Sequence, residues 1–367
     1  MRTRRNNIMI GGGVAALASL GAGYAAYRQM GSMAAYDAKV AAARAEPPAP
    51  AGLRGLVQLA SLAPSGHNTQ PWRFITSESR LDILPDFTRR TPIVDPDDHH
   101  LFVSLGCAGE NLAIAAAEHG RPGVLRFDPA GEGGIAFEFE RGSSARSELY
   151  PAIARRQSTR AEYDGTLVPA ADLRQLVAVA AIPGVDLVLV TDRSQINQLR
   201  DLVRVGNDMQ MADPAFLREL KSWLRFNPRE ASLRGDGLFS AASGNPSLPN
   251  WLGPVFFDLA FNAAAENKRY ARHIDSSAGL AIFSAHEAGP EGWVQVGRSC
   301  QRFALKATAL GLKTAFANQP VEVVALRPEL ASMIGLPGRR PDLVMRFGRG
   351  PELPFSPRRS LEEILGR

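Results

Sequence analysis

The chain has 367 residues, of which 45% are apolar and 22% are charged, and this is the composition of a globular protein with room for a large core. Its 42 basic and 37 acidic residues leave a net charge of +5. This excess is small and scattered, and no nucleic-acid-binding motif accompanies it, so we expect no nucleic-acid partner. Cys107 and Cys300 lie far apart, without a C-x-x-C pair or a histidine cluster nearby, which excludes a disulfide framework and a cysteine-based zinc site.

Residues 1–30 have the features of a targeting segment. Arg4 and Arg5 are followed by a weakly apolar, Gly- and Ala-rich run at residues 8–27, and this pattern resembles a twin-arginine export signal. We therefore expect an exported or periplasmic protein that uses the twin-arginine export machinery and stays membrane-tethered if the segment is not cleaved. The alternative is a single membrane anchor, because the run is nearly long enough to span a bilayer. Residues 31–54, rich in alanine and then in proline, are predicted to be a linker.

The remaining sequence contains two similar halves. Residues 106–120 and 297–311 are both 15-residue runs that begin and end with glycine and repeat small apolar residues at helical spacing, which predicts two closely packed helices. The segments that start at Leu56 and Leu173 each show a helical run, a break, a short apolar strand and a polar turn. A further strand follows each glycine-bounded helix, in GVLRFD in the first half and in PDLVMRFGRG in the second.

This order of elements predicts an α+β fold in which each half has a mostly antiparallel sheet flanked by helices. We assign residues 55–145 to the first half and residues 146–367 to the second, as two tandem copies. An insertion at about 205–270 is rich in glycine, serine and proline, which is typical of a loop or lid. The alternative is two unrelated α/β halves that share a common helix composition.

The polar motifs, in contrast, are not duplicated. PSGHNTQPW, at residues 64–72, occurs only in the first half, and RRQSTR, at residues 155–160, occurs only before the second. Each half therefore retains one part of a site, which predicts one composite site per chain.

The two motifs favour two kinds of ligand chemistry. Three arginines with serine, threonine and glutamine between them suit a phosphate, to which Arg358 and Arg359 near the C-terminus could also bind; the alternative is a solvated basic surface. Ser65, Asn68 and Gln70, held between two prolines, suit the polar edge of a flat heteroaromatic ring; the alternative is a turn that bonds its own backbone. Together the two motifs describe a mononucleotide-like cofactor.

Three segments carry a specific resemblance to a known family. APSGHNTQPWRF resembles the P-S-x-x-N-x-Q-P-W segment of the nitroreductase superfamily, and RRQSTRAEYD resembles its R-x-S-x-R/K-x-F-D segment, with one extra residue after Arg160. Residues 304–350 are similar to its C-terminal helix, flavin-flanking loop, small helix and final strand. The resemblance covers most of residues 55–362, with the three motifs in the family's order.

This resemblance implies FMN as the cofactor and a small-molecule substrate, with NAD(P)H as a possible donor. Family members are usually homodimers with the flavin at the subunit interface, so this chain resembles the fused, Acg-type branch: a monomeric pseudo-dimer with one flavin site. The implied cofactor-binding residues, with no catalytic side chain assigned, are Ser65, Asn68, Gln70, Arg156, Gln157, Ser158, Arg160, Asn318, Gln319, Arg358 and Arg359.

Two other hypotheses remain open: an exported protein that binds or shelters FMN with little turnover, and an anchored interaction protein without cofactor. The DPDDHH segment at residues 95–100 is predicted to be an exposed turn and helix start, capped by Asp97 or Asp98, and we expect no metal there.

Overall fold

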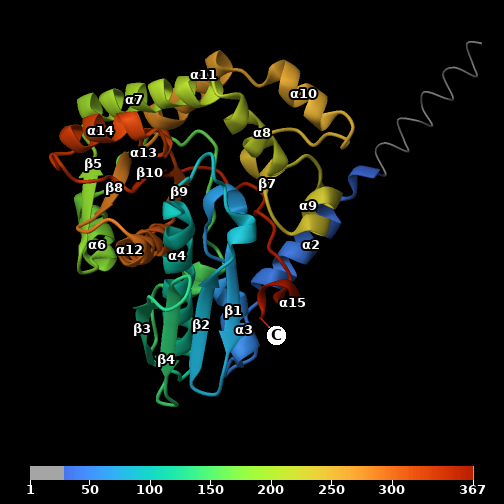
Figure 1. Ribbon diagram of the computed structural model, residues 1–367, viewed down its shortest axis with the longest axis vertical. Coiled ribbons are helices and arrows are strands. Elements are labelled where there is room, and N and C mark those ends of the chain that lie inside the picture. The colour runs from blue at the N-terminus through green and yellow to red at the C-terminus, as the bar shows by residue number, and fades with distance from the viewer. Residues whose placement is uncertain (1–28, 367) are drawn as a thin grey trace, which may run out of the picture.

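The computed structural model describes residues 29–366, so nearly all of the expected export signal lies outside the described residues. The described chain contains two four-stranded antiparallel sheets with helices packed around and between them (Figure 1). A third pair of short parallel strands joins segments of the insertion.

The first sheet has the strand order β1-β2-β4-β3. Its strands are β1 (Trp72–Thr76), β2 (Arg80–Pro85), β3 (Gly123–Asp128) and β4 (Gly134–Phe139). Helices α3 (Leu53–Ala60) and α4 (His99–Glu118) cover one face, and β1 accordingly alternates between buried residues such as Phe74 and exposed residues such as Ile75. Trp72 is fully buried and belongs to the core.

The second sheet has the strand order β5-β8-β10-β9. Its strands are β5 (Val185–Val190), β8 (Gly279–Ala285), β9 (Lys313–Phe316) and β10 (Leu343–Gly348). Strand β8 is buried on both faces because Phe283 packs into the core shared with α12 (Pro290–Ala309), whereas Ile282 packs into a second core beside α7 (Arg193–Met211). Helix α6 (Ala170–Ala180) precedes β5.

The two sheets have the same topology in chain order. Each has a first and a second strand, a 20-residue helix, and then a third and a fourth strand, with the fourth strand inserted between the second and the third. One expected match was wrong: β10 corresponds to β4 and not to β3, which contains GVLRFD. The strand that corresponds to β3 is the four-residue β9, which is too short to give a clear pattern in the sequence.

Helices α4 and α12 pack against each other at the centre of the molecule, between the two sheets (Figure 1). A Cβ atom added to Gly106 would lie 2.1 Å from the carbonyl oxygen of Val294, and one added to Gly297 would lie 2.0 Å from that of Val103. The contact is therefore reciprocal, with each glycine facing the residue three positions before the other, as in a two-fold interface. Helix α4 is long and apolar enough to span a membrane, but most of its length is buried in this core.

The largest difference between the halves is the connection between their first two strands. Strands β1 and β2 form a hairpin, whereas β5 and β8 are separated by the inserted elements. These elements are α7, α8 (Pro214–Ser222), β6 (Leu224–Arg225), α9 (Pro228–Arg234), β7 (Leu238–Phe239), α10 (Gly253–Ala260) and α11 (Ala263–Asp275). The segment expected to be a loop or lid is thus largely helical.

The expected linker also contains structure. Residues Met33–Arg44 form helix α2, which packs against α9 and buries Tyr36 and Val40. An alanine-rich sequence favours a helix, and this one docks because Tyr36 and Val40 share an apolar cluster with Ala231 of α9 and Phe239 of β7. The remaining helices are α5 (Tyr150–Ile153), α13 (Gln319–Glu322), α14 (Arg327–Met333) and α15 (Leu361–Ile364).

Candidate functional site

Two adjoining cavities lie where the halves meet. The larger cavity has a volume of about 420 Å³, which is within the range of small-molecule sites. The smaller cavity shares Pro64, Ser65 and Arg160 with it. The once-only motifs at residues 64–72 and 155–160 therefore meet here, although they are about 90 residues apart in the chain.

The smaller cavity is lined by positive charge. Arg44, Arg156 and Arg358 are at most 9% exposed and all line it, and Arg160 stands between the two cavities. Within residues 29–366, no carboxylate forms an ion pair with any of these four arginines. Buried charges are normally paired, so the cluster has the charge and burial that suit an anion.

Burial destabilises the charged forms of these arginines, and their lowered pKa values show it. Burial lowers the pKa of Arg156 to about 10 and that of Arg358 to about 9, and the charge of Arg156 contributes to the shift at Arg358. Burial and repulsion from both neighbours also lower the pKa of Arg44. An anion with two negative charges would remove this penalty, because it would supply the missing counter-charge and hydrogen-bond acceptors.

Backbone contacts hold the RRQSTR segment at the cavity. Ser158 forms a bridge with Thr314 of β9, and the Thr159 amide donates to the carbonyl of Thr314 over 2.8 Å. Gln157 donates to the carbonyl of Leu353 over 2.8 Å, so its amide binds the chain. Arg156 donates one Nη2 bond to the carbonyl of Leu62, whereas its buried Nε atom has no partner.

The loop at residues 64–70 takes an unusual backbone path. His67, Asn68 and Gln70 have φ values of 45°, 55° and 53°, which non-glycine residues rarely adopt. Contacts with distant segments hold this conformation: Asn68 Nδ2 donates to the carbonyls of Gly237 and Pro357, both over 3.1 Å. A strained loop fixed in this way is typical of a binding site.

Two predicted residues do not reach either cavity. Gln70 is fully buried and donates to the Gly235 carbonyl, while its Oε1 accepts from the Arg359 amide. Arg359 donates to the carbonyl of Gln70 and lies 3.6 Å from Asp86. Contact of these two side chains with a ligand stays a prediction, and in this structure each bonds its own protein and fixes the loop and the C-terminal segment.

Asn68 and Arg358 line the smaller cavity but are heavily engaged. Arg358 donates to Asn68 Oδ1 over 2.9 Å and to the carbonyls of Ser61, Leu62 and Ala63. Its charge therefore acts on the cavity chiefly through its field. Ser65 lines both cavities, and its Oγ accepts from the Gln70 amide.

Asn318 and Gln319, both predicted to lie beside the flavin, line the larger cavity. Asn318 Oδ1 accepts from the Val344 amide over 2.9 Å, whereas the buried Oε1 of Gln319 has no partner. Opposite them, the inserted elements contribute mostly apolar side chains: Phe216, Leu220, Phe226, Leu248, Phe256 and Phe257. The insertion is thus the wall that covers the cavity.

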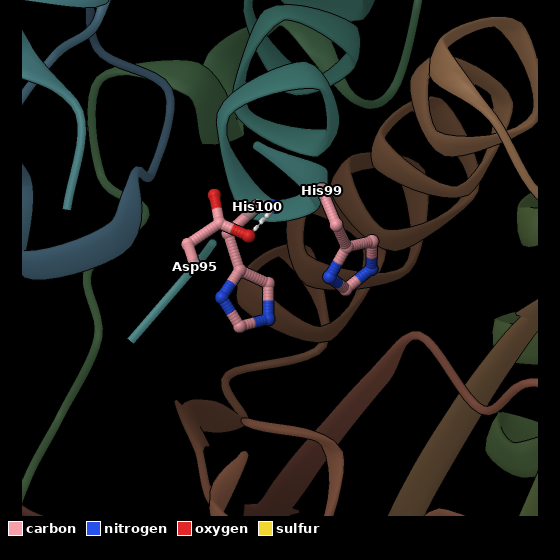
Figure 2. A group of neighbouring side chains, drawn as sticks. All are labelled: Asp95, His99 and His100. Atoms are coloured by element: carbon pink, nitrogen blue, oxygen red, sulfur yellow. Dashed lines mark hydrogen bonds between the residues drawn. The ribbon is translucent and has the colours of Figure 1, made fainter. Parts of the chain in front are cut away.

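The segment expected to be an exposed turn is exposed only in part: Pro96 and Asp97 are exposed, whereas Asp95, His99 and His100 are buried. Figure 2 shows Asp95, His99 and His100 together at the first turn of α4. Asp95, and not Asp97 or Asp98, caps this helix, because its two oxygens accept from the amides of His100 and Leu101, both over 3.0 Å. The three side chains offer ligand atoms within 4.8 Å of one another, but a cation there would compete with the helix amides for Asp95.

We expect the folded protein to lose stability as the pH falls from 7 to 5. Burial lowers the pKa of His67 to about 4, that of His100 and His273 to about 3, and that of His99 well below 6.5, so the unfolded chain takes up these protons first. Burial raises the pKa of Asp95 and Asp342 to about 6, and these two carboxyls offset only part of the loss because four histidines oppose them.

Urea titrations at several pH values measure how steeply the free energy of unfolding changes with pH. His273→Asn should reduce it by up to about 1.4 kcal/mol per pH unit, the contribution of one proton. An unchanged slope would show that His273 does not carry the linkage.

Sequence reasoning missed Arg44 and the apolar lid residues. Arg44 is the only charged residue at residues 41–45, in an otherwise alanine run, and this isolation was the available signal. The phenylalanine pairs of the insertion were visible, but nothing in the sequence shows which cavity they cover.

Residues 153–349 match the sequence model of the family described as "Nitroreductase family". Rv3131 of Mycobacterium tuberculosis, provisionally named an NAD(P)H nitroreductase, is 28% identical over 324 residues, which cover 85% of this chain and 90% of the relative. The protein acg of the same organism, provisionally given the same name, is 25% identical and covers 85% of this chain and 94% of the relative. Among solved structures, the FMN-dependent nitroreductase NfnB of Mycobacterium smegmatis has a TM-score of 0.40 at 12% identity, covering 59% of this chain and 96% of that one. Because the family match spans more than half of its length, the chain belongs to the nitroreductase family.

Proposed function

We propose that this protein is an FMN-dependent oxidoreductase with one flavin site per chain, built from both halves. The observation that carries the proposal is the unpaired cluster of buried arginines at the end of a 420 Å³ cavity. The cluster matches a phosphate monoester, and the adjoining cavity is large enough for a ring system.

The residues present fit this cofactor. Arg156, Ser158 and Arg160 would hold the phosphate and the adjoining chain, because all three line the smaller cavity. The buried polar atoms without a partner include Nε of Arg156 and Nε of Arg44 at the smaller cavity and Oε1 of Gln319 at the larger one. When bound, FMN supplies hydride and electron transfer.

The protein's own contribution is to bind, orient and exclude water. Arg160 lies between the two cavities, where a fixed positive charge stabilises negative charge on a ligand that extends through both. The aromatic wall from α8 and α10 keeps water from the reacting atoms. The relatives named as NAD(P)H nitroreductases support a nicotinamide as the electron donor.

The paired topology supports a pseudo-dimer within one chain. The sheets share one strand order, and Gly106 and Gly297 make reciprocal contacts across α4 and α12. The proposed site uses residues 64–68 from one half and residues 156–160 from the other, which gives one site and not two. We also propose export by the twin-arginine route, on the grounds of Arg4, Arg5 and the apolar run after them.

The aromatic wall also supports a second candidate, a protein that shelters FMN with little turnover. Phe257 of α10 is buried and lines the cavity, so the insertion restricts access to it. Absorbance spectroscopy of the purified protein separates the candidates.

We expect one FMN per chain, with an absorption band near that of free flavin, bleached by NADH or NADPH. Flavin that stays oxidised with both donors would support the sheltering protein, and a chain that takes up no FMN would overturn both. Free FMN mixed with the same donors is the control.

A further inference from the structure

Helix α2 lies against the elements that build the smaller cavity. The Tyr36 ring packs against Phe239 at a centroid distance of 4.6 Å, and its hydroxyl donates to the carbonyl of Phe355. Lys39 donates to the carbonyl of Ser232 in α9. The helix thus bridges the insertion and the C-terminal segment, and it lies outside the part of the chain that matches the family.

The last residue of α2 is a cation directed at the cavity. Arg44 is 8% exposed, and its guanidinium lies 3.9 Å from the centre of the Phe355 ring. Its Nη1 donates to the carbonyls of Ala154 and Arg156, over 2.8 and 3.4 Å, whereas its buried Nε has no partner. It lines the same small cavity as Arg156.

This placement is unfavourable without a ligand. Arg44, Arg156 and Arg358 repel one another, and within residues 29–366 no acidic side chain is paired with them. Docking α2 brings the third positive charge into this group, so repulsion favours the undocked helix when the cavity is empty. With an anion in the cavity, the charge of Arg44 is attracted to the site and favours the docked helix.

We propose that α2 is a clasp over the anion site, in which Arg44 binds the phosphate directly and holds α2 against the fold. The identity of the phosphate as that of FMN rests on the proposed function, whereas the clasp itself needs only a phosphate. Because coupling between two equilibria is reciprocal, the phosphate stabilises docked α2 and docked α2 tightens phosphate binding. The segment that follows the expected export signal is therefore part of the cofactor site.

Flavin affinity is the first test, measured on the full chain by fluorescence quenching. Arg44→Gln should weaken FMN binding by about 10- to 100-fold, the effect of losing one charged hydrogen bond in a buried site. Riboflavin, which lacks the phosphate, should change less than about twofold, since its ring does not meet Arg44. Asp37→Asn, on the same helix with an exposed side chain away from the cavity lining, is the control and should bind FMN like the unchanged protein.

Hydrogen exchange of the α2 amides is the second test, and its main probe is inorganic phosphate, so it does not depend on flavin binding. Inorganic phosphate and FMN should both slow exchange at residues 33–44 of the unchanged chain, whereas riboflavin should not. Arg44→Lys keeps the charge and should retain part of the protection; it also replaces Arg44→Gln if that variant does not fold.

The outcomes separate this proposal from the proposed function. If Arg44→Gln lowers FMN and riboflavin affinity equally, or leaves both unchanged, Arg44 is not a phosphate ligand. If phosphate leaves α2 exchange unchanged, the clasp is wrong even if FMN binds. If phosphate protects α2 but no flavin binds, the clasp stands and the FMN assignment fails.

Discussion

Purified Arg156→Ala protein is expected to be colourless, with FMN affinity reduced by about 100-fold or more. Arg156 is 3% exposed, lines the smaller cavity and makes one hydrogen bond to its own chain. Its Nε atom has no partner and is therefore available to a ligand. The cofactor-free variant should be more stable than the cofactor-free unchanged protein, because the substitution relieves repulsion at Arg44 and Arg358.

Flavin content after purification and a thermal melt of the cofactor-free protein measure the two effects. Arg155→Ala is the matched control, since Arg155 is adjacent in sequence but exposed, and it should keep its flavin. An Arg156→Ala protein that retains one flavin per chain would show that the phosphate binds elsewhere.

Gly297→Ala is expected to destabilise the fold by about 3 kcal/mol, with the packing of α4 against α12 disrupted. The added Cβ would lie 2.0 Å from a backbone carbonyl oxygen, and neither helix can move without separating the two halves. Urea unfolding followed by circular dichroism measures the change. Gly52→Ala, where an added Cβ meets nothing within 4 Å, is the control and should change stability by less than about 0.5 kcal/mol.

The reciprocal glycine gives a stricter test. Gly106→Ala should cost a similar amount, but the double variant should cost less than the sum, because one separation of the helices relieves both clashes. Additive effects would mean that the two glycines do not share one contact.

The sequence predicted the parts of the fold that depend on local pattern. The glycine-bounded runs form the C-terminal parts of α4 and α12, which each begin seven residues earlier, and the first glycine of each run marks the contact between the two helices. The match between β3 and β10 failed because strand order depends on pairing between distant segments, which a short strand such as β9 does not reveal. Helix α2 was predicted to be a linker because its docking depends on apolar residues of the insertion, such as Ala231 and Phe239, which are distant in sequence.

The same division applies to the site. Of the predicted cofactor residues, the structure brings Ser65, Asn68, Gln157 and their neighbours to the cavities but turns Gln70 and Arg359 toward each other. Residue type shows which groups can bind a phosphate or a ring edge. It does not show whether a donor is already used by a carbonyl of its own chain, as in Arg358.

By itself, the sequence determined the family resemblance, the two halves and the unequal distribution of polar motifs, because these are properties of residue order. Only the tertiary structure decided which charges share a buried space. Arg44, Arg156 and Arg358 come from the beginning, the middle and the end of the chain. Their isolation from every carboxylate among the described residues, which is the physical basis for an anion site, arises only when folding removes them together from water.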